Sequence, residues 1–400
     1  MKETKFKQTE IGDIPVDWEV KTIREAFRIL PNNTLSRDCL NYSKGDYYNI
    51  HYGDVLIKFP EYTDCKIEEI PHINDGSSFN KTVLHDGDIV MADTAEDETA
   101  GKMTEIFNSQ EMKIVSGLHT IPMRPLIEFA PKWLGFSMNC SLYHNQLLPL
   151  QCGTKVTSVS KSAIADTMIA YPSTVEEQER IAEALSDVDG LLRELDGVIA
   201  KKRAIKQGAM QELLTGKRRL EGFTGEWEEK KLGKVVDFQR GQVLTSAQYV
   251  TGNVPVVAGG KTFAGYHNKP NRKGKTICIS ASGAYAGFVS YYEIPIFASD
   301  CSTIGEGKNY DIRFVYYFLL AHQDDIYKMQ TGGAQPHIHP KDVAPMDFHY
   351  PKDIEEQTAI ANILSDMDEE IAALEAKRAK YEQVKQGMMQ ELLTGKIRLV

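Results

Sequence analysis

The sequence lacks the signals of secreted and membrane-spanning proteins. Its 400 residues include only six cysteines, and no two of them form the C-x-x-C pair that redox and zinc sites use. Because the cysteines are scattered, we expect reduced, mostly buried thiols and no disulfide framework. The chain shows no signal peptide and no apolar run long enough to span a bilayer, so we expect a cytoplasmic protein without a membrane partner.

Motifs of common nucleotide-binding and methyl-transfer enzymes are also missing. Residues 260–262 (Gly-Lys-Thr) have the ending of a phosphate-binding loop, but Pro255 stands where the motif requires its first glycine. Residues 274–276 fail in the same way, with Lys269 at that position. The chain has no G-x-G-x-x-G fingerprint and no Asn/Asp-Pro-Pro-aromatic tetrad. We therefore expect neither catalytic residues nor a cofactor in this chain.

Two possible metal sites are weak. His337 and His339 would share one face of a strand, but no further ligands stand at zinc spacing. The acidic run 93–98 lacks the alternating ligands and the glycine of a calcium-binding loop. We expect hydrogen-bonding or DNA-facing histidines, no metal, and a solvated acidic loop. The alternative for this loop is that one carboxylate accepts from a cytosine amino group.

One stretch of the chain occurs twice. Residues 171–220 and 350–399 align without a gap, and 27 of the 50 positions are identical. Apolar residues recur three and four positions apart in both copies, which predicts a single helix of ~40 residues in each, roughly 60 Å long. Both copies have a capping-box pair at the start and a glycine at the end. These signals are Thr174, Glu177 and Gly216 in the first copy, and Asp353, Glu356 and Gly395 in the second.

Helices of this length need a partner for their narrow apolar seam. The other copy is the economical choice because both copies have the same heptad phase. The spacing leaves the direction of pairing open, and two helices packed on separate cores are the alternative. The predicted seam consists of Ile181, Leu185, Val188, Leu192, Leu195, Ile199, Ile360, Leu364, Met367, Ile371 and Leu374.

A second repeat precedes each helix. The pair Trp18-Glu19 returns as Trp227-Glu228, each time followed by a lysine and then an aliphatic residue. Apolar strands after Gly87 and Gly274, and helical stretches further on, predict two modules of mixed α and β structure. We divide the chain into a first module at 1–172, a helix at 173–217, a second module at 218–351 and a helix at 352–400.

The net charge of −10 argues against a nucleic-acid partner. The distribution of charged residues along the chain, however, is compatible with one. Residues 61–98 hold eleven acidic and two basic side chains, whereas residues 230–290 hold nine basic and one acidic. The average therefore conceals a polarised chain, and the basic segment is the place to look for DNA contacts.

The basic segment contains a loop that combines cations with side chains able to reach base edges. The alternative is an ordinary solvated, lysine-rich loop. The candidate DNA-binding residues of this loop are Lys261, Tyr266, His267, Asn268, Lys269, Asn271, Arg272, Lys273 and Lys275. Arg240, Gln335 and His337 are weaker candidates. The first module has only scattered candidates, in an acidic setting: Lys44, Tyr47, Lys102 and Lys155.

With these features in view, the chain resembles the specificity subunits of type I DNA restriction-modification enzymes. The phrase Gln211–Lys217, repeated at Gln390–Lys396, and the opening Glu10–Glu19 carry the resemblance, which covers nearly the whole chain. It implies an α+β fold with two globular target-recognition domains, joined by two long helices that pair as an antiparallel coiled coil with pseudo-two-fold symmetry. Each domain would read one half of a bipartite DNA site. The acidity and greater length of the first module depart from this pattern.

The resemblance also implies partners. Double-stranded DNA would be joined by two methyltransferase (modification) subunits that carry S-adenosylmethionine, and by restriction/translocase subunits that use ATP and Mg. This chain would be a non-catalytic specificity component and would need no cofactor of its own. A stand-alone, two-domain DNA-binding regulator with a coiled-coil spacer is the alternative.

Overall fold

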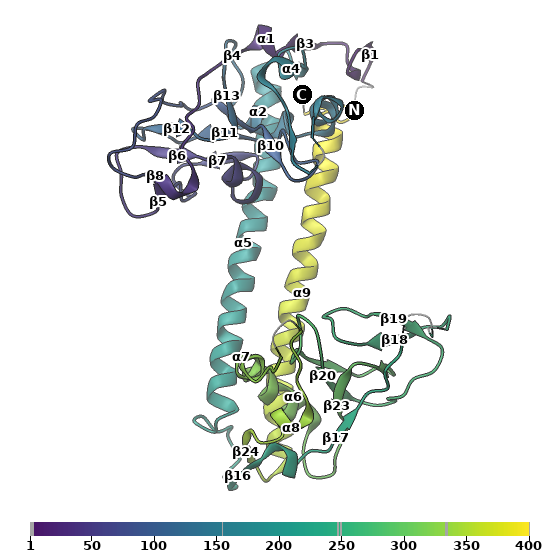
Figure 1. The fold of residues 1–400 in the computed structure, drawn as a ribbon. Coiled ribbons are helices and arrows are strands. Elements are labelled where there is room, and N and C mark those ends of the chain that lie inside the picture. Colours follow the sequence, from purple (N-terminus) through teal and green to yellow (C-terminus); the bar gives the residue numbers. More distant parts are fainter. Residues whose placement is uncertain (1–3, 154, 246–247, 249, 333–334, 400) are drawn as a thin grey trace. The chain divides into compact units, whose positions relative to one another are not determined.

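The computed structural model describes residues 4–153, 155–245, 248, 250–332 and 335–399. The chain divides into two compact units, unit 1 with residues 1–194 and 378–400, and unit 2 with residues 195–377 (Figure 1). Unit 1 is therefore built from both ends of the sequence. No helix in the described part of the chain is long and apolar enough to cross a bilayer.

Two long helices, α5 (Val175–Leu213) and α9 (Ile354–Leu392), confirm the duplicated 39-residue pattern. They begin directly after the predicted caps Thr174 and Asp353, and Asp353 Oδ1 accepts a hydrogen bond from the N–H of Glu355 at 2.9 Å. Both end shortly before the predicted glycines. Gly216 and Gly395 have φ values of +69° and +68°, the left-handed conformation that closes a helix at little cost for glycine.

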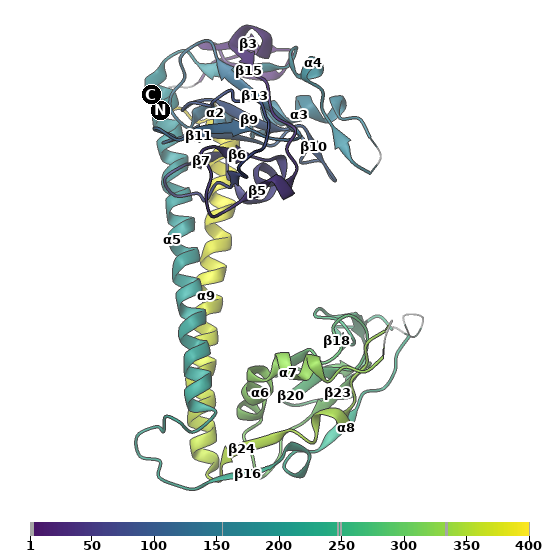
Figure 2. The same cartoon turned by 60° about the vertical axis from the view of Figure 1, so that its left-hand side comes forward.

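The helices pair antiparallel. In unit 1 the first turns of α5 lie beside the last turns of α9, as Figure 1 and Figure 2 both show. In unit 2 the end of α5 packs against the start of α9. Most of the predicted seam is buried, namely Ile181, Leu185, Leu192, Leu195, Ile199, Ile360, Leu364 and Ile371, whereas Val188, Met367 and Leu374 are half-buried. The predicted pairing is confirmed, and the alternative of separately packed helices is wrong.

The described residues of unit 1 form two larger sheets, three two-stranded pairs and several short helices. The larger sheet has the order β4 (Phe27–Ile29), β13 (Thr120–Pro125), β9 (Ile89–Ala92), β11 (Met103–Phe107) and β7 (Tyr62–Asp64). The smaller has the order β12 (Ile114–Ser116), β6 (Tyr48–Ile50), β8 (His72–Ile73) and β5 (Leu40–Asn41). Two-stranded pairs are β1 (Phe6–Thr9) with β2 (Gly12–Pro15), β3 (Trp18–Thr22) with β15 (Met168–Pro172), and β10 (Thr94–Ala95) with β14 (Thr157–Ser158). The helices are α1 (Ile23–Ala26), α2 (Trp133–Ser137), α3 (Ser141–Leu147) and α4 (Lys161–Ile164), with single turns η1 (Arg37–Cys39), η2 (Asp54–Lys58) and η3 (Leu148–Leu150).

Unit 2 repeats this plan with fewer strands. Its larger sheet has the order β17 (Phe238–Arg240), β23 (Cys301–Ile304), β20 (Thr276–Ser280) and β21 (Val289–Tyr292). Its smaller sheet has the order β19 (Gly265–His267), β18 (Val254–Val257) and β22 (Phe297–Ala298), and β16 (Trp227–Lys231) pairs with β24 (Asp347–Pro351). The turn η4 (Leu232–Lys234) and the helices α6 (Ile312–Ala321), α7 (Gln323–Lys328) and α8 (Pro340–Val343) complete it. The predicted duplication of a mixed frame is confirmed.

Matched contacts attach each domain to the helix that follows it. Gln178 donates to the carbonyl of Pro172 at 2.9 Å, and Gln357 donates to that of Pro351 at 2.8 Å. Both glutamines are buried, so each gives a hydrogen-bond donor to the carbonyl at the end of a strand. Each domain is therefore joined to the helix that follows it by the same hydrogen bond.

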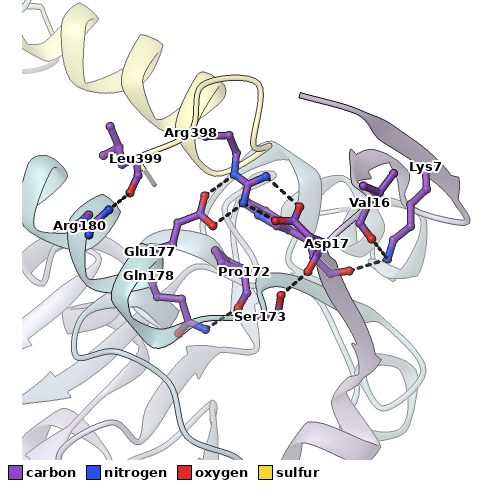
Figure 3. Close-up of polar contacts among 11 residues, drawn as sticks. Lys7, Val16, Asp17, Pro172, Ser173, Glu177, Gln178, Arg180, Arg398 and Leu399 are labelled. Atoms are coloured by element: carbon purple, nitrogen blue, oxygen red, sulfur yellow. Dashed lines mark hydrogen bonds and ion pairs between the residues drawn. The ribbon is translucent and has the colours of Figure 1, made fainter. Parts of the chain in front are cut away.

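The glutamates of the predicted capping boxes have a different role. Arg219 donates to both carboxylate oxygens of Glu356 at 2.6 and 2.8 Å. Arg398 pairs in the same way with Glu177, and it also donates to both oxygens of Asp17 at 2.9 and 2.8 Å (Figure 3). Bidentate pairs of this kind place two charge-assisted hydrogen bonds from one guanidinium on each carboxylate, which fixes its orientation as well as its charge. Each arginine comes from the tail of one helix and holds the start of the other.

Candidate nucleic-acid interface

Most of the predicted basic loop of unit 2 is open to solvent. Lys261, Lys269 and Lys273 are exposed, and so are Tyr266 and Asn268. Lys275 is partly buried, with its ammonium 3.9 Å from Glu293. Lys261 lies in the turn between β18 and β19, whereas Asn268, Lys269 and Lys273 follow β19 at the other end of this antiparallel pair, where cations and an amide are presented together. This is the combination that phosphate contact and base contact require.

Two of the predicted residues face inward. Asn271 accepts from the N–H of Ala298 at 2.7 Å and donates to its carbonyl at 2.8 Å. Arg272 donates to Thr303 Oγ1 and to the carbonyl of Arg240, each at 2.9 Å. Their polar groups are thus engaged within the unit. We assign them to positioning the loop, with direct DNA contact left to the exposed lysines.

His267 has a mixed environment. Its ring lies against Phe297, with centroids 4.9 Å apart, and its Nδ1 lies 3.1 Å from the N–H of Lys269. Arg240 is exposed at the end of β17. Both residues remain candidates, with His267 also stabilising the turn that carries Lys269.

Lys261 belongs to the opposite end of β18. Its ammonium lies over the rings of Tyr285 and Phe288, 5.0 and 5.6 Å from their centroids. A side chain at Gly259 would meet the carbonyl of Ser282 at 2.7 Å, so this stretch packs closely on the turn after β20. Lys261 is therefore held at the end of the strands, apart from the lysines that follow β19.

The two histidines of the predicted strand do not lie in one. His337 forms isolated bridges with Ser282 and Thr331, and His339 starts α8, where its N–H donates to Asp342 at 2.8 Å. The prediction of a strand was wrong because Pro340 begins a helix there. Their rings are nevertheless parallel, with centroids 6.4 Å apart. Within the described residues, no group of three metal-binding side chains includes them. Gln335 is exposed nearby in sequence.

Lys102 in unit 1 does not face solvent as a DNA contact would. Its ammonium donates to the carbonyls of Leu56 and Phe59 at 3.0 and 3.1 Å. Burial lowers the pKa of this lysine. The ammonium satisfies two backbone carbonyls at the end of the η2 turn, so we withdraw it as a DNA-binding candidate. Lys44 and Lys155 are both exposed.

Tyr47 marks a basic and aromatic cluster that the sequence did not reveal. Its ring packs edge-on against Phe79, with centroids 5.2 Å apart, and the ammonium groups of Lys81 and Lys113 each lie 5.5 Å from the Tyr47 centroid. Both lysines are exposed. We call Tyr47, Phe79, Lys81 and Lys113 the Tyr47 cluster. It concentrates positive charge in the domain whose sequence is acidic.

Strand pairing explains why these residues meet. Tyr47 directly precedes β6 and Lys113 directly precedes β12, and the two strands are parallel neighbours. Phe79 and Lys81 come from the loop between β8 and β9, which corresponds to the loop 268–275 between β19 and β20 of unit 2. The sequence indicates this site only through Tyr47 and Lys113, each of which directly precedes a strand, and it gives no such signal for Phe79 and Lys81.

These features define a class of protein. Two domains of one plan, each with exposed cations beside aromatic rings, are anchored by matched contacts to a shared antiparallel helix pair, as expected for a duplicated DNA-recognition protein. The chain belongs to the family of type I restriction modification DNA specificity domains, whose model matches residues 15–201 and 224–386.

Individual relatives agree with this family. The chain is 24% identical over 440 residues to the type I restriction enzyme MjaVIII specificity subunit of Methanocaldococcus jannaschii, covering 100% of this chain and 97% of the relative. The crystal structure of an S subunit from M. genitalium matches with a TM-score of 0.62 and 19% identity, covering 97% of this chain and 98% of that one. A chain from a study of assembly and conformational transition of the type I R-M system matches with a TM-score of 0.57 and 16% identity, covering 96% and 99%.

The family settles the general function. The protein is a DNA specificity component of type I restriction-modification, and it is not itself an enzyme. The alternative of a stand-alone regulator is not supported.

Proposed function

We propose that this chain selects the target of a type I restriction-modification complex by reading a bipartite double-stranded DNA sequence. Residues 1–172 form the domain for one half of the target, and residues 218–351 form the domain for the other. The matched arginine clamps carry the proposal. Arg398 on Glu177 and Arg219 on Glu356 join the tail of one helix to the start of the other in the same way, so two unlike domains are attached to two like helix ends. Unlike domains on one frame are what two different half-sites require.

The helices serve as the docking place for partner subunits in this proposal. Their two copies are far more alike than the domains, so each half of the frame offers the same surface. We expect two methyltransferase (modification) subunits to bind there and restriction/translocase subunits to join them in the cytoplasm. S-adenosylmethionine, ATP and Mg then belong to these partners. The exposed lysines of both domains neutralise DNA phosphates.

Methylation mapping tests the proposal. Long-read sequencing of the host genome is compared between the wild type and a strain from which this gene is deleted. We expect a bipartite motif, two short specified segments separated by an unspecified gap, to lose its adenine methylation in the deletion strain. An unchanged methylation pattern, or loss at a contiguous motif, would contradict the proposal. Complementation with the intact gene controls for effects on neighbouring genes.

A further inference from the structure

His119 and Asp300 occupy equivalent positions in the two recognition domains. His119 directly precedes β13 in unit 1, and Asp300 directly precedes β23 in unit 2. Each carbonyl accepts a hydrogen bond at 3.1 Å from the residue that follows the neighbouring strand, Asp93 after β9 and Ala281 after β20. The backbones of the two units therefore match at this point, although the side chains differ.

The same equivalence holds for the hydroxyl beside each side chain. His119 Nδ1 lies 3.5 Å from Thr94 Oγ1, and the carboxylate of Asp300 accepts a hydrogen bond from Ser282 Oγ. Thr94 and Ser282 each stand two residues beyond the end of their strand. The imidazole of His119 in unit 1 and the carboxylate of Asp300 in unit 2 thus occupy equivalent positions, each beside a hydroxyl group.

The segment beside this place carries several of the predicted DNA-binding residues. Thr94 pairs with Ser158, three residues after Lys155, and Ser282 forms a bridge with His337, two residues after Gln335. Gly259, two residues before Lys261, packs against Ser282 in unit 2. The chain segments that carry these candidates therefore pass beside the ends of β9 and β20. We call these two places the strand-end sites.

The strand-end sites are open to an external group. The side chain of His119 is 48% exposed, and its φ of +53° is uncommon for a residue other than glycine. Its Nδ1 faces Asp93 Oδ1 at 3.4 Å, which leaves Nε2 for a partner outside the protein. Asp300 is partly exposed, and one of its oxygens is engaged by Ser282.

We propose that His119 and Asp300 are specificity-determining residues, each forming a hydrogen bond with one base edge in its own half-site. This inference rests on the proposed function, because it names side chains that would read the bipartite target. An ionised carboxylate only accepts hydrogen bonds, so Asp300 selects a base with an exocyclic amino group in the major groove, cytosine or adenine. With Nδ1–H directed at the Asp93 carboxylate, the neutral imidazole of His119 presents Nε2 as a single acceptor. His119 therefore also selects a base with an exocyclic amino group, through a longer side chain than that of Asp300.

Two substitutions in the full chain, in complex with its modification subunits, test the assignment. The complexes are used to select binding sequences from duplexes randomised at every position of the target. In H119D, we expect the preference at one base pair of one half-site to fall roughly tenfold, because the shorter aspartate side chain withdraws the acceptor from the base edge. Aspartate tolerates the left-handed backbone that His119 adopts. In D300N, which can keep the contact with Ser282, we expect preference at one base pair of the other half-site to fall roughly tenfold.

Matched controls and alternative outcomes separate this inference from the proposed function. H85D and D347N change exposed residues away from the strand-end sites and should leave both half-sites unchanged. If H119D fails to fold, H119N replaces it, and the same base pair must change its preference. Variants that bind with wild-type preference at every position overturn the inference while DNA recognition stands. A wild-type complex with no sequence preference would instead refute the proposed function.

Discussion

Phe136 of unit 1 and Tyr317 of unit 2 occupy equivalent positions and differ by one hydroxyl group. In unit 2, Tyr317 donates to Asp368 Oδ2 at 2.9 Å, while the ammonium of Lys206 lies 2.5 Å from the other oxygen. In unit 1, Phe136 stands in the place of Tyr317, and Asp189 pairs with Lys385 at 2.7 Å. Asp189 Oδ2 is buried without a hydrogen-bond partner among the described residues.

Burial affects the pKa values of the pair formed by Asp189 and Lys385. It raises the pKa of Asp189, although the Lys385 ammonium opposes the change. Lys385 receives a second carboxylate, Glu61, at 2.8 Å. The two acids together hold the buried ammonium charged, and they raise its pKa despite desolvation. The lysine–aspartate pair of unit 1 thus has a second carboxylate, Glu61, as an additional partner, whereas the pair of unit 2 has the hydroxyl of Tyr317.

The substitution F136Y should stabilise the protein. The new hydroxyl can donate to Asp189 Oδ2, and such a bond contributes about 1 kcal/mol to the free energy of unfolding. Y317F should cost about 1 kcal/mol, because it removes the hydrogen bond to the partly exposed carboxylate of Asp368. Thermal unfolding of the purified chain measures both changes. Y316F is the control and should be nearly neutral, whereas a lower melting temperature for F136Y would mean that the site has no room for the hydroxyl.

Two neighbouring cations of the basic loop should behave differently. K273E removes an exposed cation, so we expect weaker DNA binding and a salt dependence whose slope is smaller by about 1. R272E instead leaves Thr303 and the carbonyl of Arg240 without their donor, so we expect a lower melting temperature. Fluorescence anisotropy at several salt concentrations and thermal unfolding separate the effects. An unchanged slope for K273E would remove Lys273 from the interface.

At the scale of elements, parallel strands decide where unit 1 concentrates positive charge. The neighbours β6 and β12 bring Tyr47 beside Lys113, and the loop after β8 adds Lys81. Two exposed ammonium groups around one aromatic ring suit a phosphate backbone with a base or sugar against the ring. The cluster resolves the difficulty that the acidic composition of the first module poses.

The double substitution K81E/K113E should weaken DNA binding through the first domain. Two phosphate contacts contribute about 1.8 to the slope of log affinity against log salt, so we expect a reduction of about that size. Anisotropy with a duplex that carries the complete target measures the change, and thermal unfolding checks the fold. K66E, which alters an exposed lysine of the same domain, is the control. A slope equal to that of K66E would contradict a DNA contact by the Tyr47 cluster.

At the scale of the whole molecule, both units depend on both helices. Leu364 is fully buried in unit 2, in the core that also contains Met210 and Leu213 from the end of α5. A charge at this position therefore disturbs the helix pair together with the domain that rests on it. Because unit 1 has its own core, the two units should fail separately.

The substitution L364D should abolish the contribution of one half-site and leave the base preference of the other unchanged. An unpaired carboxylate in a core costs several kcal/mol, enough to unfold unit 2 locally. Selection from randomised duplexes by the complex measures both half-sites, and total affinity should fall at least tenfold. L364M is the control, because it keeps the apolar volume. An altered preference in the half-site that remains would show that the domains do not read DNA independently.

The amino-acid sequence by itself determined the local features of this protein. Both long helices, their ends at Gly216 and Gly395, their shared seam and the strands after Gly87 and Gly274 follow from periodicity and turn chemistry, which act between residues close in the chain. The repeat also predicted that the two units share one frame. These features required no knowledge of which strands are neighbours.

Only the tertiary structure decided which side chains meet. It turned Lys102 toward backbone carbonyls, gave Glu177 an arginine 221 residues away and gathered the Tyr47 cluster. It also placed His119 beside Thr94 as it placed Asp300 beside Ser282. Strand order and the meeting of distant helix ends set these contacts, and neither leaves a periodic trace in the sequence. The physical reason is that a side chain's partners depend on packing across the fold, whereas its backbone conformation depends mainly on its neighbours in the chain.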